Sequence, residues 1–409
     1  MTDVSHEKMA TTISLPTGPE TPSEMGAQET TGTKRMGKPW MYKSLKLGPV
    51  TIPAYATPKF QIGFVAMVCF LCPGMFNAVN GLGAAGQLTA YDVNHANIAL
   101  YSTFCVVGFS AGSIANRIGL RLTLGIGGFG YFLYLASLLC YNHTSNAGFL
   151  IFAGAVLGLC AGLLWTAQGA VMLSYPLEKN KGRSIAWFWA IFNLGGVIGA
   201  LVPLSQTIHS KETNAVGDGT YIAFIILMAC GFLLAAFLCN PKFVEREDGS
   251  HVIMMKHPTW KSEILGMGQV LVSDWYIVFL FPLFLSSNWF YTYHFNGVNL
   301  AKFNIRTRSL NSVLYWLSQI FGALIFGYAL DSKFLRRTTR ARALLGVLFI
   351  LTLAVWGGGY GFQKQYTRKE VGGEGYVKLD WTDSGYIGPM FLYIFYGMFD
   401  AAWQTSIYW

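Results

Sequence analysis

Residues 148–173 read GFLIFAGAVLGLCAGLLWTAQGAVML, an apolar run without a single charged side chain. At about 1.5 Å per residue, a helix of this length crosses a hydrocarbon layer about 30 Å thick. Because lipid offers backbone amides no hydrogen-bond partners, such a segment must be helical if it spans a membrane. The stretch therefore predicts a transmembrane helix.

Similar apolar runs recur along the 409-residue chain, which is 53% hydrophobic and only 12% charged. A soluble domain carries about 25% charged residues, so this composition cannot build a water-facing surface. We predict an all-α polytopic membrane protein whose helices are embedded in the lipid bilayer. Its predicted spans, about ten by length and hydropathy, are 60–82, 96–115, 122–141, 148–173, 184–206, 220–240, 269–291, 310–330, 343–362 and 386–409.

The spans divide the chain into four predicted regions. Residues 1–59 begin with a stretch rich in Thr, Ser, Gly and Pro, and are predicted to form a disordered cytosolic tail and a connector. Residues 60–240 form a first half of six helices, and 241–268 a cytosolic linker. Residues 269–409 hold four helices and form an incomplete second half.

The net charge of +9 comes from basic residues in short connectors between the apolar runs. With the amino terminus in the cytosol, 21 of the 29 Lys and Arg residues lie on the cytosolic side and 8 on the other. This asymmetry predicts a cytosolic amino terminus and explains the charge without a nucleic-acid partner. It leaves open whether the protein resides in the plasma membrane or in an endomembrane.

Enzyme chemistry has no basis in this sequence. Outside the apolar runs there is no Ser-His-Asp ordering, no metal-ligand spacing and no phosphate loop. We therefore predict no enzyme activity, no cofactor and no metal. The glycines at 154, 158 and 162, and those at 195 and 199, form small-residue ridges that predict close helix packing in lipid.

One short element occurs twice. Residues 112–121 read GSIANRIGLR and residues 327–337 read GYALDSKFLRR. Each has a glycine four residues before an Asn or Asp, followed by basic residues, at the predicted cytosolic end of a span. The two copies lie six spans apart, which predicts a duplication of six-span halves.

The first copy resembles the connector between spans two and three of the major facilitator superfamily, G-x-x-x-D-R-x-G-R-R/K, with Asn116 in place of the acid. The resemblance implies a conformational switch, in which the glycine permits close helix approach and the acid meets a neighbouring helix end. Asn116 retains a hydrogen bond but loses the charge. The predicted switch residues are Gly112, Asn116, Arg117, Gly119, Arg121, Gly327 and Asp331.

A narrower resemblance, to the fungal branch of the Unc-ninety-three-like proteins of that superfamily, rests on four stretches. They are GMFNAVNGLGAAGQ (74–87), GLLWTAQGAVMLSYP (162–176), FYTYHFNGVNLAKFNIRTRSLN (290–311) and YGMFDAAWQTSIYW (396–409). The resemblance implies a major-facilitator-type helical bundle of twelve spans. Because about ten are present, we expect a chain truncated at its C-terminus.

In the superfamily fold, spans one, four, seven and ten line a central cavity, so polar residues in those spans are candidates for binding a substrate. Amides and acids in hydrocarbon are costly unless they face protein or water. The candidates are Asn77, Asn80, Trp165, Gln168, Asn288, Tyr291, Asp400, Trp403 and Gln404. Asp400 is the only acid well within a predicted span. It is a candidate for proton coupling, with a structural hydrogen bond as the alternative.

The resemblance favours a transporter that moves an unknown small solute by alternating access. The alternative is a non-transporting accessory protein that regulates another membrane protein, as the potassium-channel regulator behind the family name does in animals. No Arg or Lys is expected deep in a span, which argues against a strongly anionic substrate.

Overall fold

The computed structural model describes residues 37–409 except 88–90, 210–216, 253–258 and 374. Within that part, eight helices are long and apolar enough to cross a membrane, or nine when one bent pair counts as a single span. The predicted all-α polytopic fold is therefore confirmed. The tenth predicted span is also a helix, but its polar residues place it outside these eight.

The first six predicted spans are helices in the expected order. Span one consists of α1 (Pro58–Cys69), a π-helical turn (Phe70–Gly74) and α2 (Met75–Gly81). Pro73 lies within the turn, where its missing N–H interrupts the α-helical hydrogen-bond ladder. The other five are α3 (Tyr91–Ile118), α4 (Leu120–Thr144), α5 (Ala147–Ser174), α6 (Lys181–Thr207) and α7 (Asp218–Ala235).

The seventh predicted span, 269–291, is not one helix. α8 (Trp260–Ser273) and α9 (Tyr276–Ser286) meet at an angle of 103°. Asp274 follows α8 with φ −112° and ψ 64°, outside the helical region. Asp favours helix ends because its side chain competes for backbone hydrogen bonds. Because α8 begins at Trp260, the predicted linker 241–268 is also partly helical.

The remaining elements follow a second π-helical segment at Tyr293–Leu300. They are α10 (Ile305–Leu330), α11 (Arg337–Gln363), the short α12 (Arg368–Val371) and α13 (Ile387–Tyr408). α10, α11 and α13 match the last three predicted spans to within a few residues at most ends.

The predicted tail and connector 1–59 contain regular structure just before α1. The elements are a 3-10 helix (Pro39–Tyr42) and the antiparallel hairpin of β1 (Leu45–Leu47) and β2 (Val50–Ile52). The hydroxyl of Tyr42 donates to the Phe243 carbonyl at 3.0 Å. This hydrogen bond ties the connector to the segment that follows α7. The predicted disorder of residues 1–36 falls outside the described residues.

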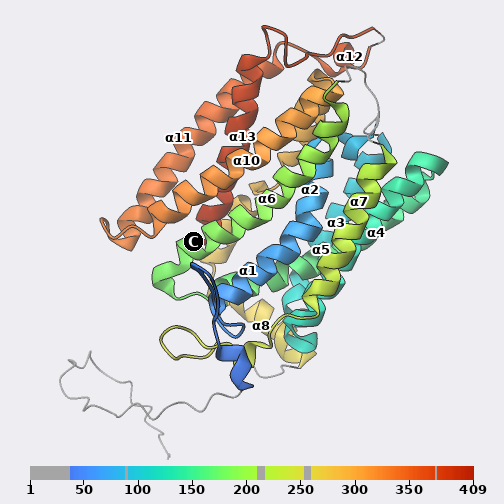
Figure 1. The fold of residues 1–409 in the computed structure, drawn as a ribbon. Coiled ribbons are helices and arrows are strands. Elements are labelled where there is room, and N and C mark those ends of the chain that lie inside the picture. The colour runs from blue at the N-terminus through green and yellow to red at the C-terminus, as the bar shows by residue number, and fades with distance from the viewer. Residues whose placement is uncertain (1–36, 88–90, 210–216, 253–258, 374) are drawn as a thin grey trace, which may run out of the picture. The chain divides into compact units, whose positions relative to one another are not determined.

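The helices pack in two connected sets, α1–α7 and α10–α13 (Figure 1). α5 packs against α3 and α4, and α4 against α7, while α13 packs against α10 and α11. α6 lies beside α1 on one side and along α10 on the other. The α6–α10 contact is thus the main junction between the helices before residue 240 and those after 290.

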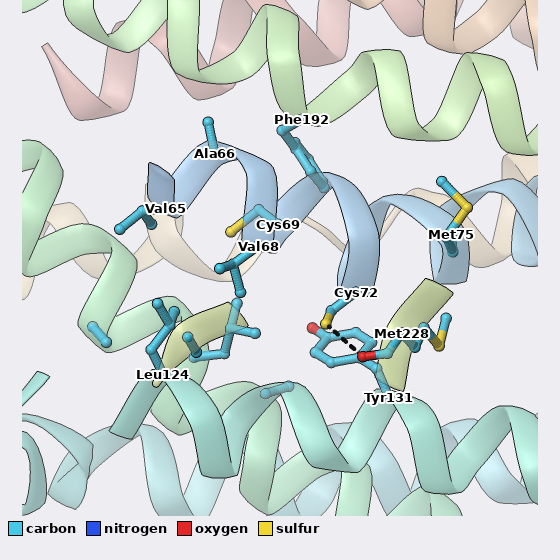
Figure 2. Close-up of a cluster of buried hydrophobic side chains, with 14 of the residues drawn as sticks. Val65, Ala66, Val68, Cys69, Cys72, Met75, Leu124, Tyr131, Phe192 and Met228 are labelled. Carbon is cyan, nitrogen blue, oxygen red and sulfur yellow. Dashed lines mark hydrogen bonds between the residues drawn. The ribbon is translucent and has the colours of Figure 1, made fainter. Parts of the chain in front are cut away.

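Figure 2 shows the core around α1, where apolar side chains meet those of α4, α6 and α7. Cys69 and Cys72 are fully buried there, and the Cys72 thiol donates to the Met228 carbonyl oxygen at 3.6 Å. Tyr131 and Phe192 are packed into the same cluster. Both cysteines therefore act as small apolar side chains in this core.

The predicted glycine ridges lie at close helix contacts. A Cβ added to Gly154 would lie 2.5 Å from the carbonyl oxygen of Ala96 on α3. One added to Gly195 would lie 2.5 Å from the Phe70 carbonyl oxygen in span one. Both distances are too short for a side chain, so the packing role predicted for these glycines is confirmed.

Candidate functional site

The predicted cavity residues fall into separate groups. Asn288, Tyr291, Asp400 and Gln404 lie near one another, since Gln404 Nε2 donates to Asn288 Oδ1 at 3.4 Å and Tyr291 lies within electrostatic reach of Asp400. Trp403 packs against Phe399, with ring centroids 5.8 Å apart on the same helix. Asn77 and Asn80, both half-buried, make no side-chain hydrogen bond among the described residues.

Asp400 is the polar centre of the first group. It is fully buried on α13, and its Oδ2 accepts hydrogen bonds from Gln319 Nε2 at 2.7 Å and from the Tyr315 hydroxyl at 3.2 Å. Its Oδ1 has no hydrogen-bond partner in the described part of the chain. A buried carboxylate without a cation is costly, so this oxygen can take up a proton or an external donor.

His294 extends this cluster through Tyr315. Its Nδ1 lies 3.4 Å from the Tyr315 hydroxyl, and its ring stacks on Tyr396 with centroids 4.0 Å apart. Tyr315 therefore contacts both His294 and Asp400. Sequence analysis missed Tyr315 and Gln319, although their spacing of four residues places two polar side chains on one face of α10.

The second group lies on α5. Gln168 is fully buried, and its Oε1 accepts a hydrogen bond at 3.0 Å from the hydroxyl of Tyr408, near the end of α13. The Trp165 indole donates to the Tyr131 hydroxyl at 3.1 Å. The Tyr408 contact therefore connects the α5 group to the helix that carries Asp400.

The second copy of the repeated element joins α10 to α6. Asp331, at the end of α10, accepts hydrogen bonds from the backbone N–H groups of Gly182 at 2.9 Å and Arg183 at 2.7 Å. These groups lie in the first turn of α6, where a carboxylate is stabilised by unpaired N–H groups and by the helix dipole. A Cβ on Gly327 would overlap Ala186. We call this region the Asp331 end.

The first copy makes different contacts. A Cβ on Gly112 would meet nothing within 4 Å, whereas Gly119 follows α3 with φ +84°. Arg121 Nε donates to the Leu238 carbonyl at 2.9 Å, and the Arg117 guanidinium lies 5.3 Å from the centre of the Trp260 ring. Asn116 lies on the same helix, α3. Of the two elements, only the second forms the α6–α10 junction.

A buried arginine joins the two helix sets at the other end of α10. Arg308, in the first turn of α10, is fully buried. Its Nε donates to the Leu82 carbonyl at 2.6 Å and its Nη2 to the Gly83 carbonyl at 2.9 Å. Asn299 Nδ2 donates to the Gly81 carbonyl at 2.8 Å. We call these residues the Arg308 end.

The expectation that no basic side chain lies deep in a span did not consider Arg308, which is buried in the protein but lies in the first turn of α10. It placed the start of the eighth span at 310, which left Arg308 in a loop. α10 in fact begins at Ile305, because the Asn304 side chain caps it by accepting from the Thr307 N–H at 3.1 Å.

Residues 57–408 match the Major Facilitator Superfamily. An UNC93-like protein of Schizosaccharomyces pombe is 54% identical over 370 residues, which are 90% of this chain and 73% of the relative. UNC93-like protein 1 of Arabidopsis thaliana is 40% identical over 357 residues, which are 87% of this chain and 77% of that one. The chain belongs to the UNC93-like proteins of the major facilitator superfamily. Both predicted resemblances are confirmed.

The superfamily fold is also found by structural comparison. The xylose transporter XylE from E. coli matches with a TM-score of 0.53 at 13% identity, over 86% of each chain. At this identity the likeness concerns the fold alone. This UNC93-like protein thus shares the helix arrangement of the superfamily fold.

Beside the Arg308 end, this UNC93-like protein has a buried ion pair. Asp380 accepts hydrogen bonds from Asn304 Nδ2 at 2.8 Å and Arg306 Nε at 2.7 Å. Arg306 also donates to the Ile208 carbonyl, which follows α6. The hydrogen bond from Arg306 holds the pKa of the Asp380 carboxyl well below its usual range. The pair therefore stays charged in mildly acidic solution.

We expect Asp380→Asn to lower the unfolding temperature of the protein by several degrees, because it leaves Arg306 buried without its anion. A carboxyl with a depressed folded-state pKa contributes stability above its unfolded pKa, about 4, and loses it as the pH falls through the lower folded value. The difference between wild type and variant should therefore be equal at pH 7 and pH 5.

Thermal unfolding in detergent at both pH values measures this difference. Asp274→Asn, at an exposed acid beside α8, serves as the matched control and should change little. A difference that disappears by pH 5 would contradict the depressed pKa of Asp380.

Proposed function

We propose that this protein is a transporter that moves a small solute across the membrane by alternating access. In this proposal, residues 60–240 and 269–409 belong to two halves that rock against each other around a central site. The superfamily fold supports the proposal, as do the polar contacts that join the two helix sets at both ends of α10.

The observation that carries the proposal is the buried carboxyl of Asp400. Gln319 and Tyr315 donate to its Oδ2, and Tyr291 and Gln404 also lie within reach of the carboxyl. The carboxyl forms no ion pair among the described residues, and a buried carboxylate without a cation is costly in an apolar span. A carboxyl that gains and loses a proton, or that binds a polar solute, accounts for the arrangement.

The contacts at the two ends of α10 are of a kind that can break and re-form as the two halves move. At the Asp331 end and at the Arg308 end, side chains bind backbone groups of the opposite set. Water can replace a backbone partner of this kind, so each end can open at modest net cost. Alternating access requires that the ends open one at a time.

The charge distribution supports an orientation for this transporter. Basic residues gather after Asp331, at positions 333 and 336 in the connector and at 337, 340 and 342 in the first turns of α11. By the positive-inside rule, the Asp331 end faces the cytosol, and so does the amino terminus. The Arg308 end then faces the opposite compartment.

Uptake into vesicles tests the proposed function. Purified protein is reconstituted, and the vesicles are incubated with a defined mixture of sugars, amino acids, organic acids, nucleosides and phosphate esters under an imposed pH gradient. Mass spectrometry should find at least one solute enriched over vesicles that lack the protein.

No enrichment of any solute, together with capture of a membrane protein at a fixed stoichiometry, would instead favour an accessory role. The UNC93-like names of the relatives do not decide between the two roles.

A further inference from the structure

Arg308 is a buried cation whose charge is balanced by no acid among the residues that the structure describes. Its three terminal donor groups lie within the protein, and two of them bind backbone carbonyls of Leu82 and Gly83. Nη1 has no partner among the described residues. The nearby acid Asp380 is already paired with Arg306. Within the described part of the chain, the guanidinium is therefore hydrogen-bonded only in part and has no counter-ion.

The position of Arg308 in its helix makes the burial of its charge more costly. The first turn of a helix carries a partial positive charge, which disfavours a cation there. A buried charge without a counter-ion also destabilises the folded protein. Folding alone therefore gives no reason for an arginine at this place, where an apolar residue would be more stable.

A second cation lies within electrostatic reach. Lys378 is half-buried, and its Nζ donates to the Leu300 carbonyl at 2.7 Å. Burial, together with the positive charge of Arg308, lowers the pKa of Lys378 to about 8. Among the residues that the structure describes, no carboxylate forms an ion pair with Lys378 or Arg308. Both cations are held by carbonyl oxygens that carry only partial charge.

We propose that Arg308, assisted by Lys378, is the binding site for the oxyanion of a small solute, a carboxylate or a phosphate. When the Arg308 end opens, the oxyanion replaces the Leu82 and Gly83 carbonyls and engages the Nη1 group. A guanidinium binds carboxylate and phosphate through two parallel hydrogen bonds, which carbonyl partners cannot match in strength. The proposal rests on the proposed transport function and names its substrate class.

The hydrogen bonds of Arg308 to Leu82 and Gly83 also give the anion a role in opening the Arg308 end. While Arg308 binds Leu82 and Gly83, it holds the connector after α2 against α10. An anion that competes for the guanidinium releases this connector. The arginine therefore binds the backbone when the end is closed and the solute when it is open.

Binding can be measured without transport, by thermal unfolding of the full chain in a neutral detergent. Inorganic phosphate and succinate should each raise the unfolding temperature by several degrees in a saturable way. Sodium chloride of equal ionic strength should not. Arg308→Gln should weaken the apparent affinity by about tenfold or more. Lys378→Gln should weaken it less.

Lys333→Gln is the matched control, because Lys333 is an exposed cation at the Asp331 end. It should leave the anion effect unchanged. Dihexanoyl phosphatidic acid separates a lipid headgroup from a free anion, since the proposal expects phosphate alone to suffice.

Three results would overturn the proposal: no saturable effect of phosphate or succinate on the wild type, an unchanged effect in both Arg308→Gln and Lys378→Gln, or stabilisation by the lipid alone. Lys378→Gln keeps the test valid if Arg308→Gln does not fold. Anion binding without uptake would refute the proposed transport but not this site, whereas uptake of neutral solutes only would refute this site but not transport.

Discussion

Replacing Asp400 with Asn should abolish the increase in uptake that a pH gradient drives. Asn keeps the size of the side chain and can still accept hydrogen bonds from Gln319 and Tyr315. It cannot bind and release a proton. If protonation of Asp400 couples solute movement to the gradient, the variant should still bind or exchange solute but should no longer concentrate it.

The comparison needs an acid that is not part of the cluster. Asp274→Asn removes an exposed carboxyl beside α8 and should leave gradient-driven uptake unchanged. Tyr315→Phe removes one hydrogen bond to Asp400 while leaving the carboxyl, so it should reduce the rate without abolishing coupling. Unchanged pH-driven uptake in Asp400→Asn would discard the coupling role and leave the structural hydrogen bond as its explanation.

The two glycines of the repeated element should respond oppositely to alanine. At Gly327 a Cβ would overlap Ala186 and lie 2.8 Å from the Gly182 carbonyl oxygen, so α6 and α10 must separate. Overpacking of this kind destabilises a protein by about 1–3 kcal/mol. It should also weaken the hydrogen bonds of Asp331 to α6, and so should slow uptake.

At Gly112 the same Cβ would meet nothing within 4 Å. Gly112→Ala should therefore be neutral, or stabilising by about 0.5–1 kcal/mol through the higher helix propensity of alanine. The pair forms a matched control, because both glycines stand four residues before the polar residue of the repeat. Thermal unfolding in detergent and uptake rates measure both variants, and equal effects at the two sites would contradict the assignment of the junction to Gly327.

Much of the fold follows from the sequence, because a bilayer leaves few solutions for apolar runs of this length. The glycine ridges at Gly154 and Gly195 were predictable for the same reason, since small residues bring helices together in lipid. The break between α8 and α9 was not, because Asp274 lies in a run whose mean hydropathy is high enough for an unbroken span. A local backbone preference decided the structure there.

The site was predictable only in part. A single acid in an apolar span is conspicuous, which identified Asp400. Its partners Tyr315 and Gln319 come from α10, a helix that the resemblance does not assign to the cavity, and pairing between helices cannot be read from one sequence. Arg308 was missed because hydropathy placed the start of its span at 310, five residues after the observed start of α10 at Ile305.

We propose that polar contacts close the Asp331 end and the Arg308 end of this protein and that each end opens separately. Spin labels carried on noncanonical amino acids at positions 179 and 333 report on the Asp331 end, and labels at 209 and 377 on the Arg308 end. Asp331→Asn should lengthen the distance between the first pair and leave the second pair short. Unchanged distances, or lengthening of both pairs together, would contradict the account.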